Sequence, residues 1–510
     1  MFSGRMPMKR VLYILFLFLL VQEVSAQHKA YISTYGGLQN NTCNQVKATS
    51  DGGYIMIGTT NSSGCGNTDM YIVKTDSAGK KIWSKTYGGE LNEEGFSVEQ
   101  TYDHGYAFLG FTNSFGNGGY DVYLVRTDSN GVFQWQRTYG GADWDFGYSI
   151  RQLADSGFVI VGQTYSIGQG NGDVYVIRAD RYGDTLWTKA IGGTGYDVAN
   201  SVTLFRDSLY FIAGTTTSFG LGDTDMYVIK MNNNGVVEKD TTFGSTHVDK
   251  ASSIRLTSNN NLLIYGSSDT VNPGSFSEVM IKLDSNCHYT WSPTWQIYTC
   301  SGNSIGSDAV ELLNGNIITM GTSNCNGSGG YDMHIQITQS AGWWITGPNF
   351  GGTNNEQGIS IAVGKNDYMF FAGSSDSPGY TNGLYNVFTV CVDTIQNSAL
   401  YTFVIYNYKD TSICTLGIAS NSVIPPGVKI FPDPITTTAT MLVQGDIGEH
   451  YSVNVYSNLG QQVITMPLML SAHGQSIGHI EKTGLAPGTY MYVIVNKEGD
   501  RVGSGKFIVD

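Results

Sequence analysis

Short runs of alternating apolar and polar residues fill most of the chain, and the same order of runs returns about every 52 residues. In the third copy, an alternating run at Gly147–Leu153 precedes the turn Asp155-Ser156-Gly157 and an apolar run at Phe158–Gly162. Another alternating run starts at Asp173, and a fourth contains Trp187. Period-two alternation broken by Asp-x-Gly turns is typical of antiparallel strands joined by hairpins. Each unit is therefore predicted to form four short antiparallel strands.

A short motif, usually Tyr-Gly-Gly, ends each unit and gives the number of units. It begins at Tyr35, Tyr87, Tyr139, Ile191, Phe243, a degenerate Tyr298, and Phe350. Four strands in a unit of about fifty residues are the signature of a β-propeller blade. One blade cannot bury both of its faces, so the blades must stack around an axis. The sequence predicts an all-β chain with a seven-bladed propeller over residues 27–405.

The seventh blade has two candidates for its fourth strand. One is Ala399–Ile405, which follows the third strand in the chain. The other is Lys29–Tyr35, which has the fourth-strand pattern but no strands before it. Pairing strands from both chain ends would cover the two open edges of the ring. We therefore favour closure by Lys29–Tyr35.

Composition supports a folded chain and excludes some partners. Only 14% of residues are charged, whereas the chain has 65 Gly and 32 Tyr. The net charge is −14 and no Lys/Arg cluster occurs, which argues against nucleic acid as a partner. The sequence has no Gly-x-Ser-x-Gly, His-Glu-x-x-His or phosphate-loop motif, so we expect a monomeric protein that is not an enzyme and needs no cofactor.

The N-terminal segment carries an export signal. Met1–Ala26 combines basic residues, the apolar run Val11–Val21 and the small-residue sequence Val24-Ser25-Ala26. This is the layout of a cleaved signal peptide. The alternative, an uncleaved anchor, is disfavoured because the apolar run is short for a bilayer.

Export permits disulfides, and the chain has seven cysteines. Cys43 and Cys65 lie in one repeat, and Cys300 and Cys325 lie at similar separation in a later one. We predict these two pairs, with Cys391–Cys414 as a candidate third.

One polar side chain, usually acidic, follows each anchor by six residues. The positions are Asn41, Glu93, Asp145, Asp197, Asp249 and Glu356, with Asp308 as the substitute in the irregular sixth unit. A carboxylate ring at the channel mouth would suit Ca²⁺ or a basic ligand. Short acidic side chains also fix loops by accepting backbone N–H bonds, and we favour that interpretation. Trp144, Trp343 and Trp344 fall outside the regular Trp position and are candidate aromatic binding residues.

The repeated Asp-x-x-Gly-x-x-x-Trp pattern, as at Asp76, Gly79 and Trp83, resembles the tryptophan-docking repeat of quinoprotein propellers and, more loosely, the Asp-box hairpin of sialidase-like propellers. The whole unit is most similar to exported bacterial YGG/DGGY-repeat proteins. This resemblance covers residues 27–405 and implies a fold, not an activity.

The repeat ends near Tyr406, and residues 406–427 are expected to be a linker. Residues 428–510 contain Phe431-Pro432-Asp433-Pro434, Leu459-Gly460-Gln461-Gln462-Val463, Leu485-Ala486-Pro487-Gly488-Thr489-Tyr490 and Lys506-Phe507-Ile508-Val509. These motifs resemble the type A C-terminal sorting domain of the type IX (Por) secretion system, although Asp433 stands where the family more often has Asn. The alternating strands predict a small Ig-like β-sandwich. The alternative is an ordinary appended binding domain.

The resemblance implies passage through the type IX secretion machinery, removal of the domain, and release or attachment at the outer cell surface. Together these features predict a secreted or cell-surface binding or adhesion protein whose ligand is a glycan or a surface protein. The alternative is a secreted polysaccharide hydrolase or lyase with its site at the channel mouth.

Overall fold

The computed structural model divides into two compact units, Met1–Gly417 and Ile418–Asp510. It describes residues 29–206, 209–291, 295–325, 329–340, 342, 347–364, 368–378, 381, 384–392 and 402–409, and in the second unit 428–431, 438–444, 452–456, 462–467, 469–470, 475–482, 485–495 and 501–509. The expected signal peptide, Trp343, Trp344 and nearly all of the expected linker lie outside these residues. Within them, no helix has the length and apolarity needed to cross a membrane.

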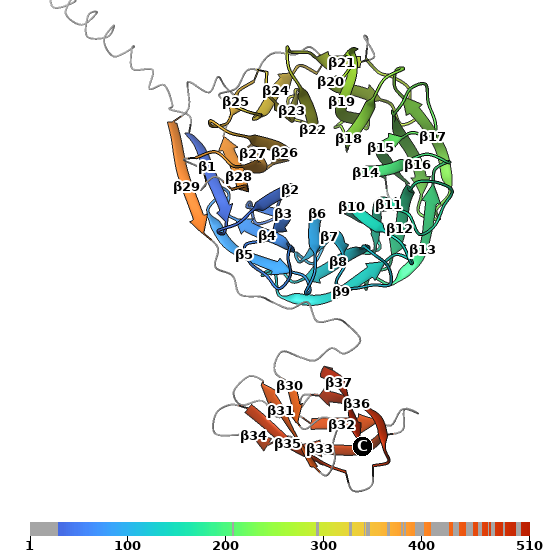
Figure 1. Cartoon of the computed structure of the whole chain (residues 1–510), viewed down its shortest axis with the longest axis vertical. Coiled ribbons are helices and arrows are strands. Elements are labelled where there is room, and N and C mark those ends of the chain that lie inside the picture. Colours follow the sequence, from blue (N-terminus) through green and yellow to red (C-terminus); the bar gives the residue numbers. More distant parts are fainter. Residues whose placement is uncertain are drawn as a thin grey trace, which may run out of the picture. The chain divides into compact units, whose positions relative to one another are not determined.

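The first unit is a ring of seven antiparallel sheets, as the repeat predicts (Figure 1). Strands are given from the inner to the outer edge of each blade. The first blade is β2 (Asn41–Ala48), β3 (Tyr54–Thr60), β4 (Asp69–Thr75), β5 (Lys81–Tyr87); the second is β6 (Glu93–Gln100), β7 (Tyr106–Thr112), β8 (Asp121–Thr127), β9 (Phe133–Tyr139); the third is β10 (Asp145–Gln152), β11 (Phe158–Thr164), β12 (Asp173–Ala179), β13 (Thr185–Ile191); and the fourth is β14 (Asp197–Phe205), β15 (Leu209–Thr216), β16 (Asp225–Asn232), β17 (Val237–Phe243). The fifth blade is β18 (Asp249–Leu256), β19 (Leu262–Asn272), β20 (Ser275–Leu283), β21 (Trp295–Tyr298); the sixth is β22 (Ser304–Glu311), β23 (Ile317–Ser323), β24 (Asp332–Thr338), β25 (Asn349–Phe350); and the seventh is β26 (Glu356–Val363), β27 (Met369–Ser375), β28 (Asn386–Val392), β1 (Lys29–Gly36), β29 (Thr402–Lys409).

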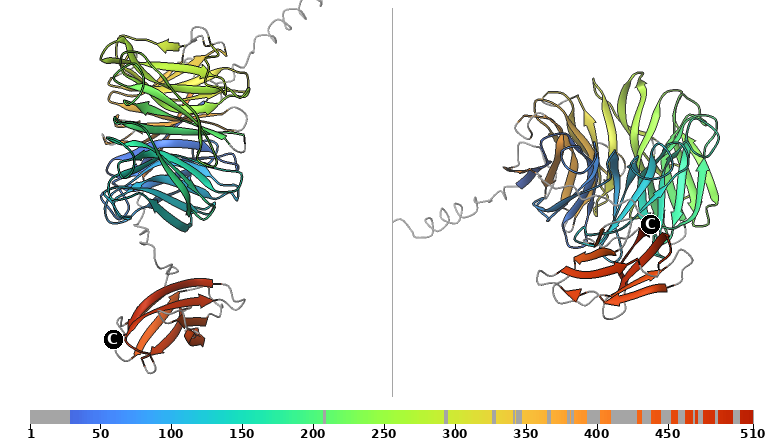
Figure 2. Two further views of the ribbon diagram at one scale, coloured as in Figure 1. Left: turned by 90° about the vertical axis from the view of Figure 1, so that its right-hand side faces the viewer. Right: turned by 60° about the horizontal axis from the view of Figure 1, so that its bottom comes forward.

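The middle strands of each blade are apolar on both faces because neighbouring blades cover both faces. Every residue of β7 and β8 is buried, whereas the outer strand β9 is partly exposed. Viewed edge-on in the left panel of Figure 2, the strands that face the viewer run across the thickness of the ring. The repeated tryptophans pack at the junctions between blades: Trp83 meets Tyr106 of the next blade edge to face, with ring centroids 6.1 Å apart. Such contacts bury the large apolar area that stabilises the stacked ring.

Strands from both chain ends close the ring. β1 pairs antiparallel with β28, with Ile32 opposite Val390, and so completes the seventh blade. The favoured closure by Lys29–Tyr35 is confirmed. The other candidate segment overlaps β29, which pairs in parallel with β1 on its outer side, with Ile32 opposite Ile405. The seventh blade therefore has five strands.

The cysteine pairing differs in part from the prediction. The structure joins Cys300 and Cys325 in a disulfide. Cys65 is disulfide-bonded, but Cys43 is a buried free thiol, so the expected Cys43–Cys65 pair is wrong. Cys43 lies on β2 and is packed in the hydrophobic core between the seventh and first blades. Cys391 is also a buried thiol, with its Sγ 3.5 Å from the Ser77 carbonyl oxygen, so the Cys391–Cys414 pair is wrong too.

The second unit consists of two four-stranded sheets, as expected for a β-sandwich. One sheet has the order β30 (Val428–Phe431), β31 (Thr438–Gln444), β35 (Gln475–Glu481), β34 (Met469–Leu470), and the other β33 (Gln462–Pro467), β32 (Ser452–Tyr456), β36 (Gly488–Val495), β37 (Arg501–Val509). Tyr490 stacks on Phe507 in its core, and its hydroxyl donates to the Ala486 carbonyl at 2.9 Å. The Leu-x-x-Gly-x-Tyr motif thus contributes Leu485 and Tyr490 to the core of this unit.

Candidate functional site

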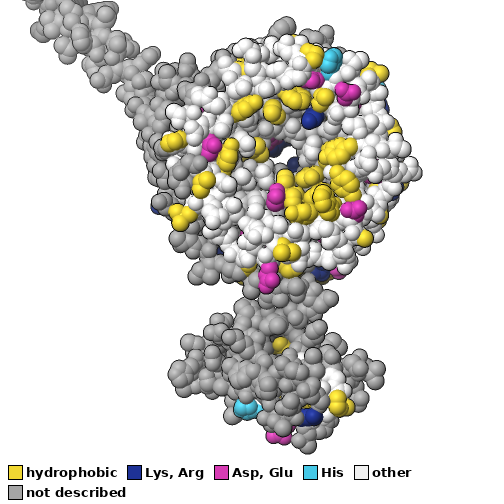
Figure 3. All heavy atoms as spheres, viewed as in Figure 1, with side chains coloured by type: hydrophobic (Ala, Val, Ile, Leu, Met, Phe, Trp, Pro, Cys, Tyr) yellow, Lys and Arg dark blue, Asp and Glu magenta, His cyan; other side chains and the backbone are white. Residues whose placement is uncertain are grey.

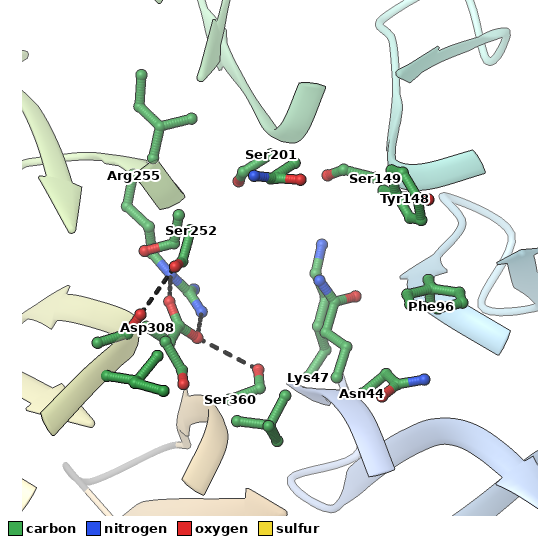
Figure 4. Close-up of a pocket in the computed structure, with 18 of the residues that line it drawn as sticks. Asn44, Lys47, Phe96, Tyr148, Ser149, Ser201, Ser252, Arg255, Asp308 and Ser360 are labelled. Atoms are coloured by element: carbon green, nitrogen blue, oxygen red, sulfur yellow. Dashed lines mark hydrogen bonds and ion pairs between the residues drawn. The ribbon is translucent and has the colours of Figure 1, made fainter. Parts of the chain in front are cut away.

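The channel through the propeller is lined by a β-bulge in every inner strand. The pairing of each inner strand with the second strand skips one residue. The skipped residues are Asn44, Phe96, Tyr148, Asn200, Ser252, Ser307 and Ile359, and all seven line a cavity of about 410 Å³ (Figure 4). A bulge re-aims the side chains around it. A regular repeat thus presents five different residue types to one cavity.

In four blades the residue after the bulge accepts an N–H from the next blade. The Gln45 side-chain oxygen accepts the Val98 N–H at 2.8 Å, and the Ser97 hydroxyl oxygen accepts the Ile150 N–H at 3.3 Å. Asp308 occupies the same position in the sixth blade and accepts the Ile361 N–H at 3.0 Å. These bonds join backbone N–H groups of the inner strands to side chains of the preceding blade.

The residues of the predicted acidic ring are buried beneath the loops at one end of the channel. Asn41, Glu93, Asp145, Asp197, Asp249 and Glu356 each begin an inner strand and are at most 1% exposed. The carboxylates accept N–H bonds from the residue four positions earlier, for example Gly141 to Asp145 at 2.8 Å and Gly352 to Glu356 at 2.6 Å. This geometry favours the loop-fixing interpretation. The described residues contain no group of three or more His, Cys, Asp or Glu side chains arranged to hold a metal.

The sixth blade departs from the predicted ring. Ser304, not Asp308, occupies the ring position, since it is the first residue of β22. Its hydroxyl donates to Glu278 at 2.6 Å, so a carboxylate from the preceding blade takes the place of the missing one. The substitution expected at Asp308 is wrong because Asp308 is the fifth residue of β22, past the bulge at Ser307, and lies beside the channel.

Each ring carboxylate faces a second carboxylate from the third strand of the preceding blade. A Cβ added to Gly88 would lie 2.3 Å from Glu93 Oε2 and 2.4 Å from Asp69 Oδ1, which explains the glycine after the anchor tyrosine. Burial, together with the nearby Glu93 charge, raises the pKa of Asp69 to about 6. Burial and the neighbouring carboxylate also raise the pKa of Asp121 and of Asp173.

Seven aromatic side chains from the second and third blades form one cluster beside the channel mouth. We call it the aromatic platform: Phe96, Phe111, Tyr120, Trp144, Phe146, Tyr148 and Tyr165. Neighbouring ring centroids are 4.9 to 6.5 Å apart. Trp144 is 51% exposed and Tyr165 38% exposed. Figure 3 shows hydrophobic side chains gathered on this side of the central opening.

Trp144, one of the predicted binding residues, is held in place by its loop. A Cβ added to Gly119 would lie 2.2 Å from the indole ring, so the ring rests directly on the neighbouring backbone. The Trp144 N–H donates to its neighbour Asp143, and its carbonyl accepts the Tyr165 N–H at 2.8 Å. A large exposed ring fixed in this way is suited to contact with a ligand.

Below the platform, the channel is lined by three cations. Lys47, Arg151 and Arg255 come from the inner strands of the first, third and fifth blades and all border the cavity. In Figure 4, Lys47 extends toward the open middle of the channel, while Arg255 lies against Asp308. Arg255 donates to Asp308 from Nε at 3.0 Å and from Nη2 at 2.5 Å. Sequence reasoning missed these residues, although they recur at intervals of 104 residues.

Comparisons with known proteins identify the C-terminal unit. Residues 429–510 match the family described as the secretion system C-terminal sorting domain. The expected type IX sorting domain is therefore confirmed, and the chain is a protein that the type IX machinery exports to the cell surface or the extracellular space. No curated protein matches the chain.

Among solved structures, PorZ, a surface component of the type IX secretion system of Porphyromonas gingivalis, aligns at 11% identity over 90% of this chain and 58% of its own, with a TM-score of 0.38. A fungal alcohol oxidase of the AA5 family in complex with copper aligns at 10% identity over 94% and 98%, with a TM-score of 0.44. Puromycin hydrolase aligns at 11% over 80% and 59%, also at 0.44. At these values the likenesses say nothing about the activity of this chain.

Proposed function

We propose that this exported propeller is a binding protein and that its ligand is a glycan that docks at the channel mouth. The observation that carries the proposal is the aromatic platform, because its exposed rings gather on one side of the mouth. Aromatic rings supply apolar contact area at low entropic cost, and a concave site with a few polar groups fixes a ligand's orientation. The cavity adjoining the platform supplies those groups.

The chemistry of the cavity supports binding over hydrolysis. A glycosidase uses two carboxyl groups on either side of the scissile bond. Among the described residues that line the cavity, Asp308 is the one carboxylate, and Arg255 binds it through two nitrogens. A carboxylate held in this way is occupied by a cation and by the Ile361 N–H.

The test is a glycan binding array with the secreted chain, followed by titration of the ligands found. Trp144→Ala is expected to weaken binding roughly tenfold or more, as for a central aromatic contact. Tyr182→Ala is the matched control, because Tyr182 is 53% exposed in the turn between β12 and β13, at the other end of the strands. Equal affinities for Trp144→Ala and the unaltered chain would contradict the proposal. Repeating the array with Ca²⁺ and with EDTA tests the metal interpretation of the acidic ring.

A further inference from the structure

The charged side chains that line the channel are mainly positive, whereas the protein as a whole is negatively charged. The chain carries a net charge of −14, yet three of the four charged side chains that line the cavity are cationic. The side chains of Lys47, Arg151 and Arg255 are 21%, 15% and 29% exposed, whereas that of Asp308 is 6% exposed. Figure 3 shows basic atoms inside the central opening. The charges that a molecule in the channel would meet are therefore mainly positive.

Ion pairs do not neutralise all three cations. Asp308 pairs with Arg255, and Glu99, on the neighbouring inner strand, pairs with Lys47. Arg151 reaches the same Glu99 oxygen only at 3.9 Å, and its Nη1 donates instead to the Ile150 carbonyl at 2.7 Å. Three cations therefore share two carboxylates. One positive charge remains, and it is centred on Arg151.

The cations also act on one another across the channel. Burial, and next the Arg151 charge, lowers the pKa of Lys47 to about 8, and Arg255 contributes to the same effect. Burial is the main cause that lowers the pKa of Arg151, and Arg255 adds to it. Like charges held close in a partly desolvated site favour a bound anion, which relieves their repulsion.

One of the cations, Arg151, lies on the same strand as two residues of the aromatic platform. Along β10 the chain passes Phe146 and Tyr148 of the platform and then Arg151, at about 3.3 Å per residue. A ligand lying on the platform would therefore extend into the cationic part of the channel. The cavity, about 410 Å³, has room for one or two sugar units rather than a folded partner.

Resting on the proposed function, we infer that the glycan is acidic and that Lys47, Arg151 and Arg255 bind its anionic group, a carboxylate or a sulfate. Arginine is well suited to this role because its planar donors match both oxyanions. Lys47 adds a point charge on the other side of the channel. The negative charge of the rest of the protein disfavours a long polyanion such as nucleic acid, so the anionic group acts as a local anchor.

The experiment titrates the secreted chain with digalacturonate and its methyl ester, and with a sulfated glucose disaccharide and its unsulfated form. Within each pair the sugar backbone is the same and only the anionic group differs. Comparing the two pairs shows whether the protein binds a carboxylate or a sulfate. We expect one acidic member to bind at least tenfold tighter than its neutral partner, and Arg151→Gln to remove that preference. Arg137→Gln is the matched control, since Arg137 lies on the outer strand β9 and pairs with Asp184. Lys47→Gln is a second variant in case Arg151→Gln does not fold.

Thermal unfolding in sodium sulfate, against sodium chloride at equal ionic strength, tests the anion site separately from the glycan. A larger stabilisation by sulfate in the unaltered chain than in Arg151→Gln supports the inference even if the glycans chosen do not bind. Equal increments in both chains overturn it, because sulfate then acts only by general exclusion from the surface. Neutral and acidic glycans bound equally, with binding lost in Trp144→Ala, would also overturn it while the proposed function stands.

Discussion

The hydroxyl of Tyr87 donates a hydrogen bond to the carbonyl oxygen of Gly131, 44 residues further along the chain, at 2.6 Å. Tyr139 makes the same bond to Gly183 at 2.8 Å, and Tyr35 bonds to Gly79. The anchor tyrosine at the end of one blade thus holds the last hairpin turn of the next blade. Two motifs that recur separately in the sequence, Tyr-Gly-Gly and Asp-x-x-Gly, meet at every such junction.

We expect Tyr87→Phe to lower the free energy of unfolding by about 1 kcal/mol, because the Gly131 carbonyl loses one of its two donors and keeps only Lys85 Nζ, at 2.7 Å, while the ring stays packed. Chemical denaturation of the chain measures the change. Tyr102→Phe is the control, since Tyr102 is 63% exposed and should change nothing. A Tyr87→Phe chain as stable as the unaltered one would contradict the prediction and show that the Lys85 hydrogen bond alone satisfies the Gly131 carbonyl.

The second prediction concerns pH and the paired carboxylates. Asp69 has a pKa of about 6 in the folded chain, raised by burial from an ordinary value near 4. Between these values the folded state binds the proton more tightly than the unfolded state does. The contribution of Asp69 to stability is therefore full below pH 4 and is lost as the pH rises through 6. Asp69→Asn should match the unaltered chain near pH 4 and be more stable by roughly 1 to 3 kcal/mol at pH 7.

Asp51→Asn is the control of opposite sign. Burial opposes the shift, but hydrogen bonds from Thr49 and Lys74 lower the pKa of Asp51 to about 2. Its stabilising contribution is present above pH 4 and is lost as the pH falls through 2. Asp51→Asn should therefore be less stable than the unaltered chain at pH 7 and equal to it near pH 2. Denaturation curves from pH 2 to 8 separate the two variants, and parallel curves for Asp69→Asn would contradict the prediction.

Much of the fold could be predicted from the sequence because each blade repeats the same strands, turns and anchors. The number of blades and the closure by Lys29–Tyr35 follow from spacing and from the need to cover open edges. The site could not be predicted in the same way. A bulge at Tyr148 interrupts the period-two alternation of β10, so the side chains beyond it, including Arg151, face where a regular strand would not place them. The aromatic platform joins residues from loops and strands of two blades, and only Trp144 stood out by position.

The Cys43–Cys65 prediction was wrong for a related reason, because a similar separation was taken as a sign of a similar position in the repeat. Cys43 follows its anchor Tyr35 by eight residues and lies in the core position that Gly95 fills in the next blade. Cys300 follows Tyr298 by two and lies in a loop. Alignment on the anchors would have separated the two pairs.

The Cys300–Cys325 disulfide replaces a hydrogen bond that other junctions make. In other blades the hydroxyl of a serine just after the second strand accepts an N–H from the loop before the first strand, as from Asp143 to Ser166 at 3.0 Å and from Leu91 to Ser114 at 2.9 Å. Cys325 stands at this serine position. Losing the disulfide should cost about 2 to 4 kcal/mol, mostly through the unfolded chain.

Cys300→Ser with Cys325→Ser should be less destabilised than Cys300→Ser with Cys325→Ala, because a serine restores the acceptor of the other junctions. Thermal unfolding with and without a reductant measures this. The reductant should lower the melting temperature of the unaltered chain more than that of either variant, because the variants retain only the disulfide of Cys65. A melting temperature insensitive to loss of the disulfide would mean that the loop is already fixed by Asn303, whose N–H donates to Asn324 at 2.8 Å.

The last prediction tests how the ring closes. Ile32 and Tyr35 of β1 are 4% and 0% exposed, and six residues of β1 pair with β28. A secreted chain that lacks residues 27–37 would expose the β28 edge and lose these buried side chains, each of which contributes about 1.5 to 3 kcal/mol. We expect loss of cooperative unfolding and rapid proteolysis.

A chain that lacks residues 402–409 should keep a closed ring, because β29 pairs only with the outer side of β1 in the described sheet. A peptide of residues 27–37 added to the shortened chain should restore protease resistance, and the same peptide with Ile32→Asp should not. Equal protease resistance of the chain without residues 27–37 and the unaltered chain would mean that β1 does not close the ring in solution.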